Sequence, residues 1–321
     1  MMEKSRIAFV IISWNSGAYI RACLDSVVLL KNRYDLSLFL IDNGSSDDTV
    51  LKTDSFVLEN PDLAVITIRN STNLGTTRSR NQALKQIRAN VHYICILDSD
   101  TIINLPAFEK MINTLADSRI MITVPRMFNR EKKEQCSVKR FPTAAIKLSK
   151  GIPVKWLNRL GGKREEYEFC PDRRMPAFHV AEGWSLSEGQ AHSTDRVAIS
   201  NSPAYSSDMP PFSTDSAHYP VDYAISACWL MRREALDIVG LFDEKIFYAP
   251  EDVDYCARIR ESGLLVSLTS DASIYHLTQR ISRDKLISWM NWLHVKGLIY
   301  YFIKHRYCFS TGRLSEKKIR Q

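Results

Sequence analysis

The sequence predicts an α/β fold with a doubly wound, mostly parallel sheet and helices on both of its faces. Strand-like apolar runs alternate with amphipathic helical patterns through the first 128 residues, and strands that alternate with helices form parallel sheets. Polar and acidic residues directly follow several of these runs. Because open α/β sheets bind ligands beyond the carboxyl ends of their strands, those residues are the first candidates for a site.

Hydrophobic periodicity predicts the individual elements. Continuous apolar runs predict strands at 7–13, 36–41, 64–68, 91–96, 120–124, 224–231 and 264–268. Apolar residues spaced three or four positions apart predict helices at 19–29, at 76–88, after Pro106, and from 251 to a stop at Gly263. A chain of 321 residues with 45% hydrophobic content can bury the core of one large domain or two modest ones.

Two aspartates follow the apolar run 91–96, which is typical of a buried parallel strand. Asp98 and Asp100 lie two residues apart, so on an extended segment their side chains point the same way. Such a pair can hold one divalent cation, directly or through water. An Asp-x-Asp pair is frequent by chance, so its position after a strand carries the argument.

Three acids crowd the first turn of the predicted helix after Pro250: Glu251, Asp252 and Asp254. The helix-end dipole favours ionised carboxylates there, whereas neighbouring acids oppose ionisation, so one of the three can be poised as a base. The alternative is that they only decorate a helix start, where acids are common. Asp254 also lies four residues before Arg258, a spacing that favours an intrahelical ion pair.

Residues 126–220 lose the alternation and are too long for an ordinary connection. Such a stretch is either an insertion that covers the substrate or partly disordered. Its aromatic and apolar residues give it something to bury, so we expect an insertion that helps to choose the acceptor. Its histidines, His179, His192 and His218, lack metal-ligand spacing and are expected to be structural or solvent-facing. The predicted organisation is a catalytic domain over 1–278 and a helical, basic tail over 279–321.

The net charge of +7 raises the question of nucleic acid as a ligand. No nucleic-acid-binding motif occurs and the basic residues form no stripe, so a nucleotide phosphate or an anionic lipid explains the charge better. Seven cysteines form no CxxC pair and lie mostly in apolar runs, which indicates buried thiols in a reducing compartment. With no signal-peptide pattern and no apolar run of transmembrane length, we expect a cytoplasmic protein.

The segment 286–303 is apolar and aromatic, and Lys304, His305 and Arg306 follow it. Tryptophan and tyrosine beside cations suit a membrane interface, so peripheral binding at the inner face of the cell membrane is one interpretation. The other is a helix pair that packs on the catalytic domain or across a homodimer, since aromatic helices are more often core. The sequence leaves both open.

Five motifs follow one another along the chain. They are 41–47 (Ile-Asp-Asn-Gly-Ser-Ser-Asp), Asn73-Leu74-Gly75 followed by Arg80-Asn81, Asp98-Ser99-Asp100, the run 228–233 leading to 240–244, and 251–254. In this combination and order they resemble family 2 glycosyltransferases of the GT-A fold, and within that family the rhamnosyltransferase-like branch that builds bacterial surface polysaccharides. The resemblance covers residues 5–128 and 222–278.

The resemblance implies a nucleotide-sugar site at the ends of the first strands. Ser13, Trp14 and Asp42 would hold the base and ribose, with Asp42 accepting the N3–H of a uracil or thymine and Arg80 flanking the base. Family members often have tyrosine where Trp14 stands, so its contact would be stacking without a hydroxyl. The other residues implied for the nucleotide-sugar are Asn15, Asn43, Gly75, Asp98, Ser99 and Trp229.

The resemblance also implies a divalent cation, Mn²⁺ or Mg²⁺, and transfer with inversion. Asp100 and His276 would bind the cation, and Asp98 would reach it, a bound water or the ribose. Asp252 would be the general base for the acceptor hydroxyl, with Glu251 and Asp254 as alternatives for that role or for binding the acceptor. The donor would be a UDP- or dTDP-linked sugar, rhamnose-like or a hexose, and the acceptor a cell-surface glycan or a lipid-linked molecule.

Two other classes of protein compete with this reading. A nucleotidyltransferase usually carries a glycine- and basic-rich phosphate loop after its first strand, where this chain has Trp14-Asn15-Ser16-Gly17. A binding module for nucleotide-sugars or a membrane surface, without catalysis, would not need Asp100, Asp252 and His276 together. Both observations favour an active transferase.

Overall fold

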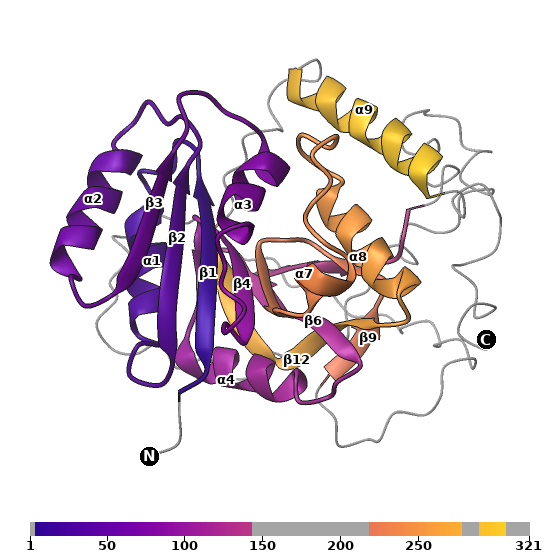
Figure 1. The fold of residues 1–321 in the computed structure, drawn as a ribbon, viewed down its shortest axis with the longest axis horizontal. Coiled ribbons are helices and arrows are strands. Elements are labelled where there is room, and N and C mark those ends of the chain that lie inside the picture. The colour runs from indigo at the N-terminus through magenta and orange to yellow at the C-terminus, as the bar shows by residue number, and fades with distance from the viewer. Residues whose placement is uncertain (1–3, 143–217, 278–288, 306–321) are drawn as a thin grey trace, which may run out of the picture. The chain divides into compact units, whose positions relative to one another are not determined.

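The computed structural model describes residues 4–142, 218–277 and 289–305 (Figure 1). These residues belong to the larger of two compact units, and the second unit, 172–216, lies outside them. Most of the predicted insertion, including His179 and His192, is therefore outside the described residues. The statements below concern the described ranges.

A ten-stranded sheet forms the centre of the described chain, in the order β3-β2-β1-β4-β11-β6-β12-β5, with β7 and β9 at its side. Its first four strands pair in parallel, as the sequence predicts. They are β1 (Arg6–Ser13), β2 (Asp35–Asp42), β3 (Ala64–Arg69) and β4 (Tyr93–Asp98). The strand order reverses between β1 and β4, which is the point where open α/β sheets place their ligands.

The second half of the sheet is mixed. Strand β11 (Cys228–Arg232) runs antiparallel to both β4 and β6 (Ile120–Phe128), and β6 pairs in parallel with the long β12 (Leu265–His276). The strand predicted at 120–124 extends to Phe128, because its pairing with β12 resumes after an irregularity between Thr269 and Ser273. The long β12 carries His276 to the same end of the sheet as Asp98.

Helices cover both faces of the sheet (Figure 1). Ile7, Phe9 and Ile11 of β1 are buried in one core cluster, whereas Ala8 and Val10 are buried in another. The first cluster includes residues of α1 (Ile20–Val28), α2 (Thr49–Glu59) and α4 (Leu105–Thr114). The second includes residues of α3 (Thr76–Leu84) and α8 (Glu251–Glu261). Burial on two sides explains why the strands are continuous apolar runs.

Helix α2 and several short elements were not predicted. Helix α2 buries only Thr49 and Phe56 and leaves Leu51 and Leu58 exposed, so its apolar pattern is weak. The described ends of the stretch from 126 to 220 form short strands, and the expectation that this stretch is an insertion stays a prediction. The remaining short elements are β5 (Thr101–Ile102), β7 (Glu134–Gln135), β8 (Val138–Lys139), β9 (His218–Val221), β10 (Tyr223–Ala224) and α7 (Ala235–Ile238).

The predicted C-terminal helical segment appears as one helix, α9 (Trp289–Lys304). No helix within the described residues is long and apolar enough to cross a membrane. The four cysteines expected in the core, Cys23, Cys95, Cys228 and Cys256, are buried free thiols.

Candidate functional site

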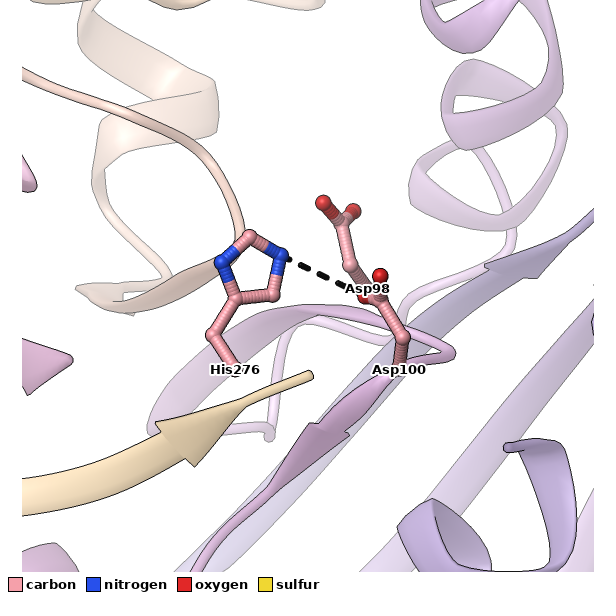
Figure 2. A group of neighbouring side chains, drawn as sticks. All are labelled: Asp98, Asp100 and His276. Atoms are coloured by element: carbon pink, nitrogen blue, oxygen red, sulfur yellow. Dashed lines mark ion pairs between the residues drawn. The ribbon is translucent and has the colours of Figure 1, made fainter. Parts of the chain in front are cut away.

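Three potential metal ligands meet at the carboxyl end of the sheet. Asp98 ends β4, Asp100 lies in the turn before β5, and His276 ends β12, so elements far apart in the sequence supply them. One ligand atom from each lies within 4.8 Å of the other two (Figure 2). Two carboxylates and an imidazole form a donor set that suits a divalent cation such as Mn²⁺. The three residues that the resemblance implied therefore fit a metal site.

Gln135 orients the imidazole of His276, a contact that was not predicted from the sequence. Its Nε2 donates to the His276 carbonyl oxygen at 2.8 Å, so its Oε1 is the atom that lies 2.8 Å from His276 Nδ1. Nδ1 therefore carries a proton, and Nε2 is turned toward Asp100 Oδ1 at 3.4 Å. Such a partner on one ring nitrogen of a histidine fixes the orientation of the ring and hence the direction of the other nitrogen.

Negative charge is concentrated at this cluster, which suits the binding of a divalent cation. Burial lowers the pKa of His276, but its hydrogen bond to Asp100 and the charges of Asp100 and Asp98 outweigh burial, and the pKa is raised. Burial raises the pKa of Asp98, and the neighbouring Asp100 adds to this while Arg80 opposes it. The pKa of Asp98 stays raised although the charges of Arg80 and His276 act to lower it, so a divalent cation would add favourable positive charge here.

Arg80 links this cluster to the acids of α8. Its side chain is 1% exposed. Nη2 donates to Asp98 Oδ1 at 2.8 Å, while Nη1 lies 2.8 Å from Ser226 Oγ and 3.4 Å from Glu251 Oε1. This burial between carboxylates favours a structural role for Arg80, and the expectation that it flanks the nucleotide base stays a prediction.

Asp252 and Glu251 form a carboxyl pair at the first turn of α8. Burial, and then the charge of Glu251, raise the pKa of Asp252 to about 7. The Val253 backbone N–H donates to Asp252 Oδ1 at 2.8 Å, which leaves Oδ2 for a ligand. Glu251 is buried, and its Oε2 has no hydrogen-bond partner. A carboxyl group that titrates near neutral pH, beside an unsatisfied buried oxygen, is typical of a catalytic site.

Asp254, the third acid, is turned to a different part of the molecule. Its carboxylate forms the predicted ion pair with Arg258 at 3.0 Å, and it also contacts Lys304 and His305. Burial raises its pKa, but these cationic partners outweigh burial and lower it. A carboxylate so held is a poor proton acceptor, so the geometry favours the ion pair over the catalytic alternative.

The ends of β1 and β2 form a second polar region. Asp42 Oδ2 accepts from the N–H groups of Gly44 and Ser45, at 3.2 and 3.1 Å, while its buried Oδ1 has no hydrogen-bond partner. Asn15 has a left-handed φ of 50°. Its N–H donates to Ser45 Oγ at 2.9 Å, and its Oδ1 accepts from the Ser46 N–H at 2.8 Å. Asp42 therefore presents one free acceptor atom in a loop pair that Asn15 fixes.

The other two expected residues of this region are also at the strand ends. Ser13 Oγ is buried and donates to the Ile41 carbonyl oxygen at 3.3 Å. Trp14 follows it and is half-buried. Ser99, between the two aspartates, donates through Oγ to Ser16 Oγ at 2.8 Å, which joins the β1 and β4 loops.

Three residues expected to touch the nucleotide-sugar serve the fold instead. Trp229 is fully buried, stacks on Phe242 and donates through Nε1 to the Ile225 carbonyl oxygen at 2.9 Å. Asn43 is buried, and its amide holds the loop before α3 through Asn73, Asn70, Leu74 and Ser79. These side chains have no polar atom left for a ligand.

Gly75 is the third of these residues. It has a φ of +82°, and a Cβ there would lie 2.4 Å from the Phe247 carbonyl oxygen. The absence of a side chain lets α3 approach the loop before α8, which brings Arg80 and Glu251 together.

Comparison with known proteins identifies the class to which this fold and site belong. Residues 8–172 match the family model of Glycosyl transferase family 2. The match spans more than half of the chain, and the chain belongs to this family.

Individual relatives are more distant. Glycosyltransferase GlyG of Streptococcus pneumoniae serotype 4 is 29% identical over 110 residues, which are 34% of this chain and 33% of that protein. Mannosyltransferase PcManGT from Pyrobaculum calidifontis, solved with GDP-Man and Mn²⁺, superposes with a TM-score of 0.55 at 14% identity, over 95% of this chain and 65% of that one. S. aureus TarS 1–349, solved with UDP-GlcNAc, superposes with a TM-score of 0.50 at 15% identity, over 88% of this chain and 62% of that one.

These solved structures establish the fold as the α/β GT-A fold of glycosyltransferases. The chain spans a third of GlyG and less than two thirds of either solved relative. The predicted fold class is therefore confirmed, and so is the family. The rhamnosyltransferase-like branch stays a prediction.

Proposed function

We propose that this chain is an inverting, metal-dependent glycosyltransferase of the hexosyltransferase class. It moves a sugar from a UDP- or dTDP-linked donor to a hydroxyl of a cell-surface glycan or a lipid-linked acceptor. The rhamnosyltransferase-like branch remains the proposed subgroup, with a rhamnose-like sugar or a hexose as the group transferred.

One observation carries the proposal: the candidate metal cluster and the carboxyl pair that contains Asp252 lie on two sides of one buried arginine. Arg80 bonds to Asp98 of the cluster and to Glu251 of the pair. Inverting transfer needs these two functions close together, one at the leaving diphosphate and one at the acceptor hydroxyl. Because one guanidinium contacts both Asp98 and Glu251, the metal cluster and the carboxyl pair are close enough to act on the same substrate.

Asp252 is the proposed general base. It takes the proton of the acceptor hydroxyl as that oxygen bonds to the anomeric carbon. The bond from this carbon to the diphosphate oxygen breaks on the opposite face, and its electron pair leaves with the nucleoside diphosphate, so the configuration inverts. A pKa of about 7 makes Asp252 a far stronger base than an ordinary aspartate, and it is still substantially ionised at neutral pH.

Asp98, Asp100 and His276 are the proposed ligands of Mn²⁺ or Mg²⁺. The imidazole beside two carboxylates favours Mn²⁺, since Mg²⁺ prefers oxygen ligands alone. A bound divalent cation offsets the negative charge that builds on the leaving diphosphate. Arg80 fixes the Asp98 carboxylate, and Gln135 fixes the His276 ring.

The nucleotide is proposed to bind at the ends of β1 and β2. The free Oδ1 of Asp42 can accept the N3–H of a uracil or thymine base. Trp14, half-buried beside it, supplies a ring on which a base can stack. Both features support a pyrimidine nucleotide as the carrier.

The surface of α9 supports peripheral binding at an anionic membrane. Trp292, Val295, Ile299 and Ile303 are 54, 53, 56 and 65% exposed, and their spacing puts them along one stripe of the helix. Residues 279–321 contain ten Lys and Arg residues but only two Asp and Glu residues. Their net charge is therefore +8, whereas the net charge of the whole chain is +7. An apolar, aromatic stripe in a cationic segment suits a bilayer with acidic headgroups.

Vesicle sedimentation tests the membrane part of the proposal. We expect the protein to sediment with vesicles that contain phosphatidylglycerol and not with pure phosphatidylcholine. Ile299→Glu should abolish sedimentation, while Ile238→Glu, at a comparably exposed isoleucine of α7, should not. If binding persists in Ile299→Glu, the stripe is not the contact. If the protein instead dimerises through α9, gel filtration of the same variant will show a monomer.

Nucleoside diphosphate release tests the central proposal and separates it from its alternatives. Purified protein is assayed with UDP-, dTDP- and GDP-sugars in Mn²⁺, Mg²⁺ or EDTA, with lipid extract as acceptor. We expect release from a pyrimidine donor that needs the cation and falls at least 100-fold in Asp252→Asn, but not in Asp237→Asn, which removes an exposed acid from α7. Donor binding without release would favour a binding module. Diphosphate production from a nucleoside triphosphate and a sugar phosphate would favour a nucleotidyltransferase.

A further inference from the structure

The helix α9 lies against the start of α8, where the proposed base is located. A Cβ on Gly297 would lie 2.7 Å from the Ala249 carbonyl oxygen and 3.1 Å from Pro250 Cδ, so the two backbones are in close contact just before Glu251. One turn further on, Tyr301 is fully buried and belongs to the same core cluster as Val253 and Tyr255. The helix is therefore packed on α8 through its backbone and through the core.

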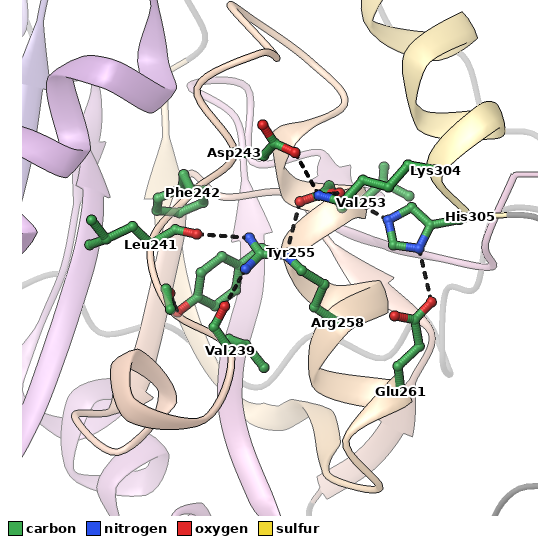
Figure 3. A network of polar contacts seen from close by, with 12 residues as sticks. Val239, Leu241, Phe242, Asp243, Val253, Tyr255, Arg258, Glu261, Lys304 and His305 are labelled. Carbon is green, nitrogen blue, oxygen red and sulfur yellow. Dashed lines mark hydrogen bonds and ion pairs between the residues drawn. The ribbon is translucent and has the colours of Figure 1, made fainter.

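Ion pairs join the end of α9 to Asp254. Figure 3 labels Lys304 and His305 beside their other two partners, Asp243 and Glu261. Lys304 Nζ lies 2.6 Å from Asp254 Oδ1 and 2.7 Å from Asp243 Oδ2. His305 Nε2 lies 2.9 Å from the same Asp254 oxygen, and its Nδ1 lies 2.9 Å from Glu261 Oε1. Lys304 and His305 thus both reach the carboxylate of Asp254, whose side chain is only 1% exposed.

The charges in this network nearly balance. Asp254, Asp243 and Glu261 face Arg258, Lys304 and, when it is protonated, His305. Burial lowers the pKa of His305, but its bonds to Asp254 and Glu261 outweigh burial and raise it. Loss of one cation would leave a buried carboxylate without full compensation. The carboxylate would then take up a proton or draw the first turn of α8 toward water, and either response loosens the contact that holds this turn.

Asp254 and Asp252 are on nearly opposite sides of the same helical turn. Two residues correspond to about 200° around an α-helix, so Asp252 faces the candidate site while Asp254 faces α9. Holding Asp254 therefore fixes the rotation of this turn about the helix axis. A misplacement of about 1 Å in a reacting group can cost on the order of 100-fold in rate.

We propose that Lys304 and His305 are positioning residues: by holding Asp254 they set where the carboxylate of Asp252 lies. The inference rests on the proposed function, because it concerns the base of that reaction. It makes α9, outside the residues that match the family model, part of what the active site needs.

A double-mutant cycle tests the inference. Lys304→Met removes the charge and keeps an apolar stem, and Lys110→Met, which breaks an exposed ion pair with Asp271, is the matched control. We expect Lys304→Met to lower the kcat of nucleoside diphosphate release at least tenfold, with the donor dissociation constant within twofold of wild type. Lys304→Arg should restore most of the rate, and the control should leave it unchanged.

Lys304→Met is then combined with Asp252→Asn, and the rate of nucleoside diphosphate release in single turnovers is compared with that of Asp252→Asn alone. Because Lys304 acts through Asp252, its removal should cost less than twofold there. Hydrogen exchange of the peptide 249–258 should rise in Lys304→Met and in the milder His305→Gln, while circular dichroism stays that of wild type.

Three results would overturn the inference. One is an unchanged kcat in Lys304→Met, and another is an equal loss of rate in both backgrounds, which would mean a general structural role. The third is unchanged hydrogen exchange over 249–258 in both variants. All three leave wild-type activity intact, so they are distinct from failure of the proposed function, in which wild type itself releases no diphosphate from any donor.

Discussion

Replacing Glu251 with Gln should move the acid limb of the pH–rate profile to lower pH. Asp252 must be ionised to accept a proton, and its pKa is raised to about 7 by burial and then by the charge of Glu251. In wild type, kcat/KM should therefore rise with pH through about 7 and level off above it. At pH 6 the rate should be about one tenth of its plateau, since each pH unit below the pKa costs tenfold in the ionised form.

Glu251→Gln removes the like charge and leaves the burial. The pKa of Asp252 should then fall on the order of one unit and stay above its ordinary value. Relative to its own plateau, the variant should be several-fold more active than wild type at pH 6, whatever the height of that plateau. Glu109→Gln, at an exposed ion pair of α4, is the control for loss of one negative charge.

The assay is the initial rate of nucleoside diphosphate release between pH 5 and 9, at subsaturating donor and constant ionic strength. A wild-type profile with no inflection between pH 6 and 8, or an inflection that stays in place in Glu251→Gln, would refute the assignment of that limb to Asp252. A limb that moves equally in Glu109→Gln would show a general charge effect instead.

Three further predictions follow from other contacts. Gln135→Leu should weaken Mn²⁺ binding about 10–100-fold, measured by calorimetry, because the His276 ring loses its orienting partner; equal affinity would contradict the metal site described here. Gly75→Ala should lower the free energy of unfolding by at least about 1–3 kcal/mol. Gly240→Ala should lower it less, because Gly240 has a similar φ of +77° but nothing lies within 4 Å of a Cβ there. Thermal melts that rank the two variants in the reverse order would refute the close contact with Phe247. His305→Gln should destabilise most at low pH, because a raised histidine pKa adds stability below its unfolded pKa that is lost as pH rises through the folded value; denaturant unfolding at pH 6 and pH 9 would show no such difference if His305 were not part of the network.

The sequence predicted most of the sheet because burial on both faces leaves a strong pattern. The parallel strands β1, β2 and β4 are nearly continuous apolar runs, and each ends at polar residues that mark the edge of the sheet. Helix α2 has no such pattern, because Leu51 and Leu58 face the solvent. Periodicity detects an element only where one of its faces is buried throughout.

Residue types and their order indicated which acids matter, but not what each side chain contacts. The motif around Arg80 marked it as important, yet only the fold shows it buried between Asp98 and Glu251. Trp229 lies in a motif and proved to be core, since a motif does not state which face of a strand a residue occupies.

Partners distant along the chain left no signal at all. Gln135 comes from a stretch without periodicity, and it meets His276 only because β6, β7 and β12 are neighbours in the sheet. The local i, i+4 pair of Asp254 and Arg258 was predictable, whereas the contact with Lys304, 50 residues away, was not.

The most direct test of the account is the anomeric configuration of the first sugar released. With the donor found in the release assay and water as acceptor, proton NMR can follow the free sugar before it equilibrates. The account predicts that the first-formed anomer has the configuration opposite to that of the donor and that Asp252→Asn forms it at least 100-fold more slowly. A first-formed anomer with the donor's configuration would contradict the single displacement in which Asp252 is the base.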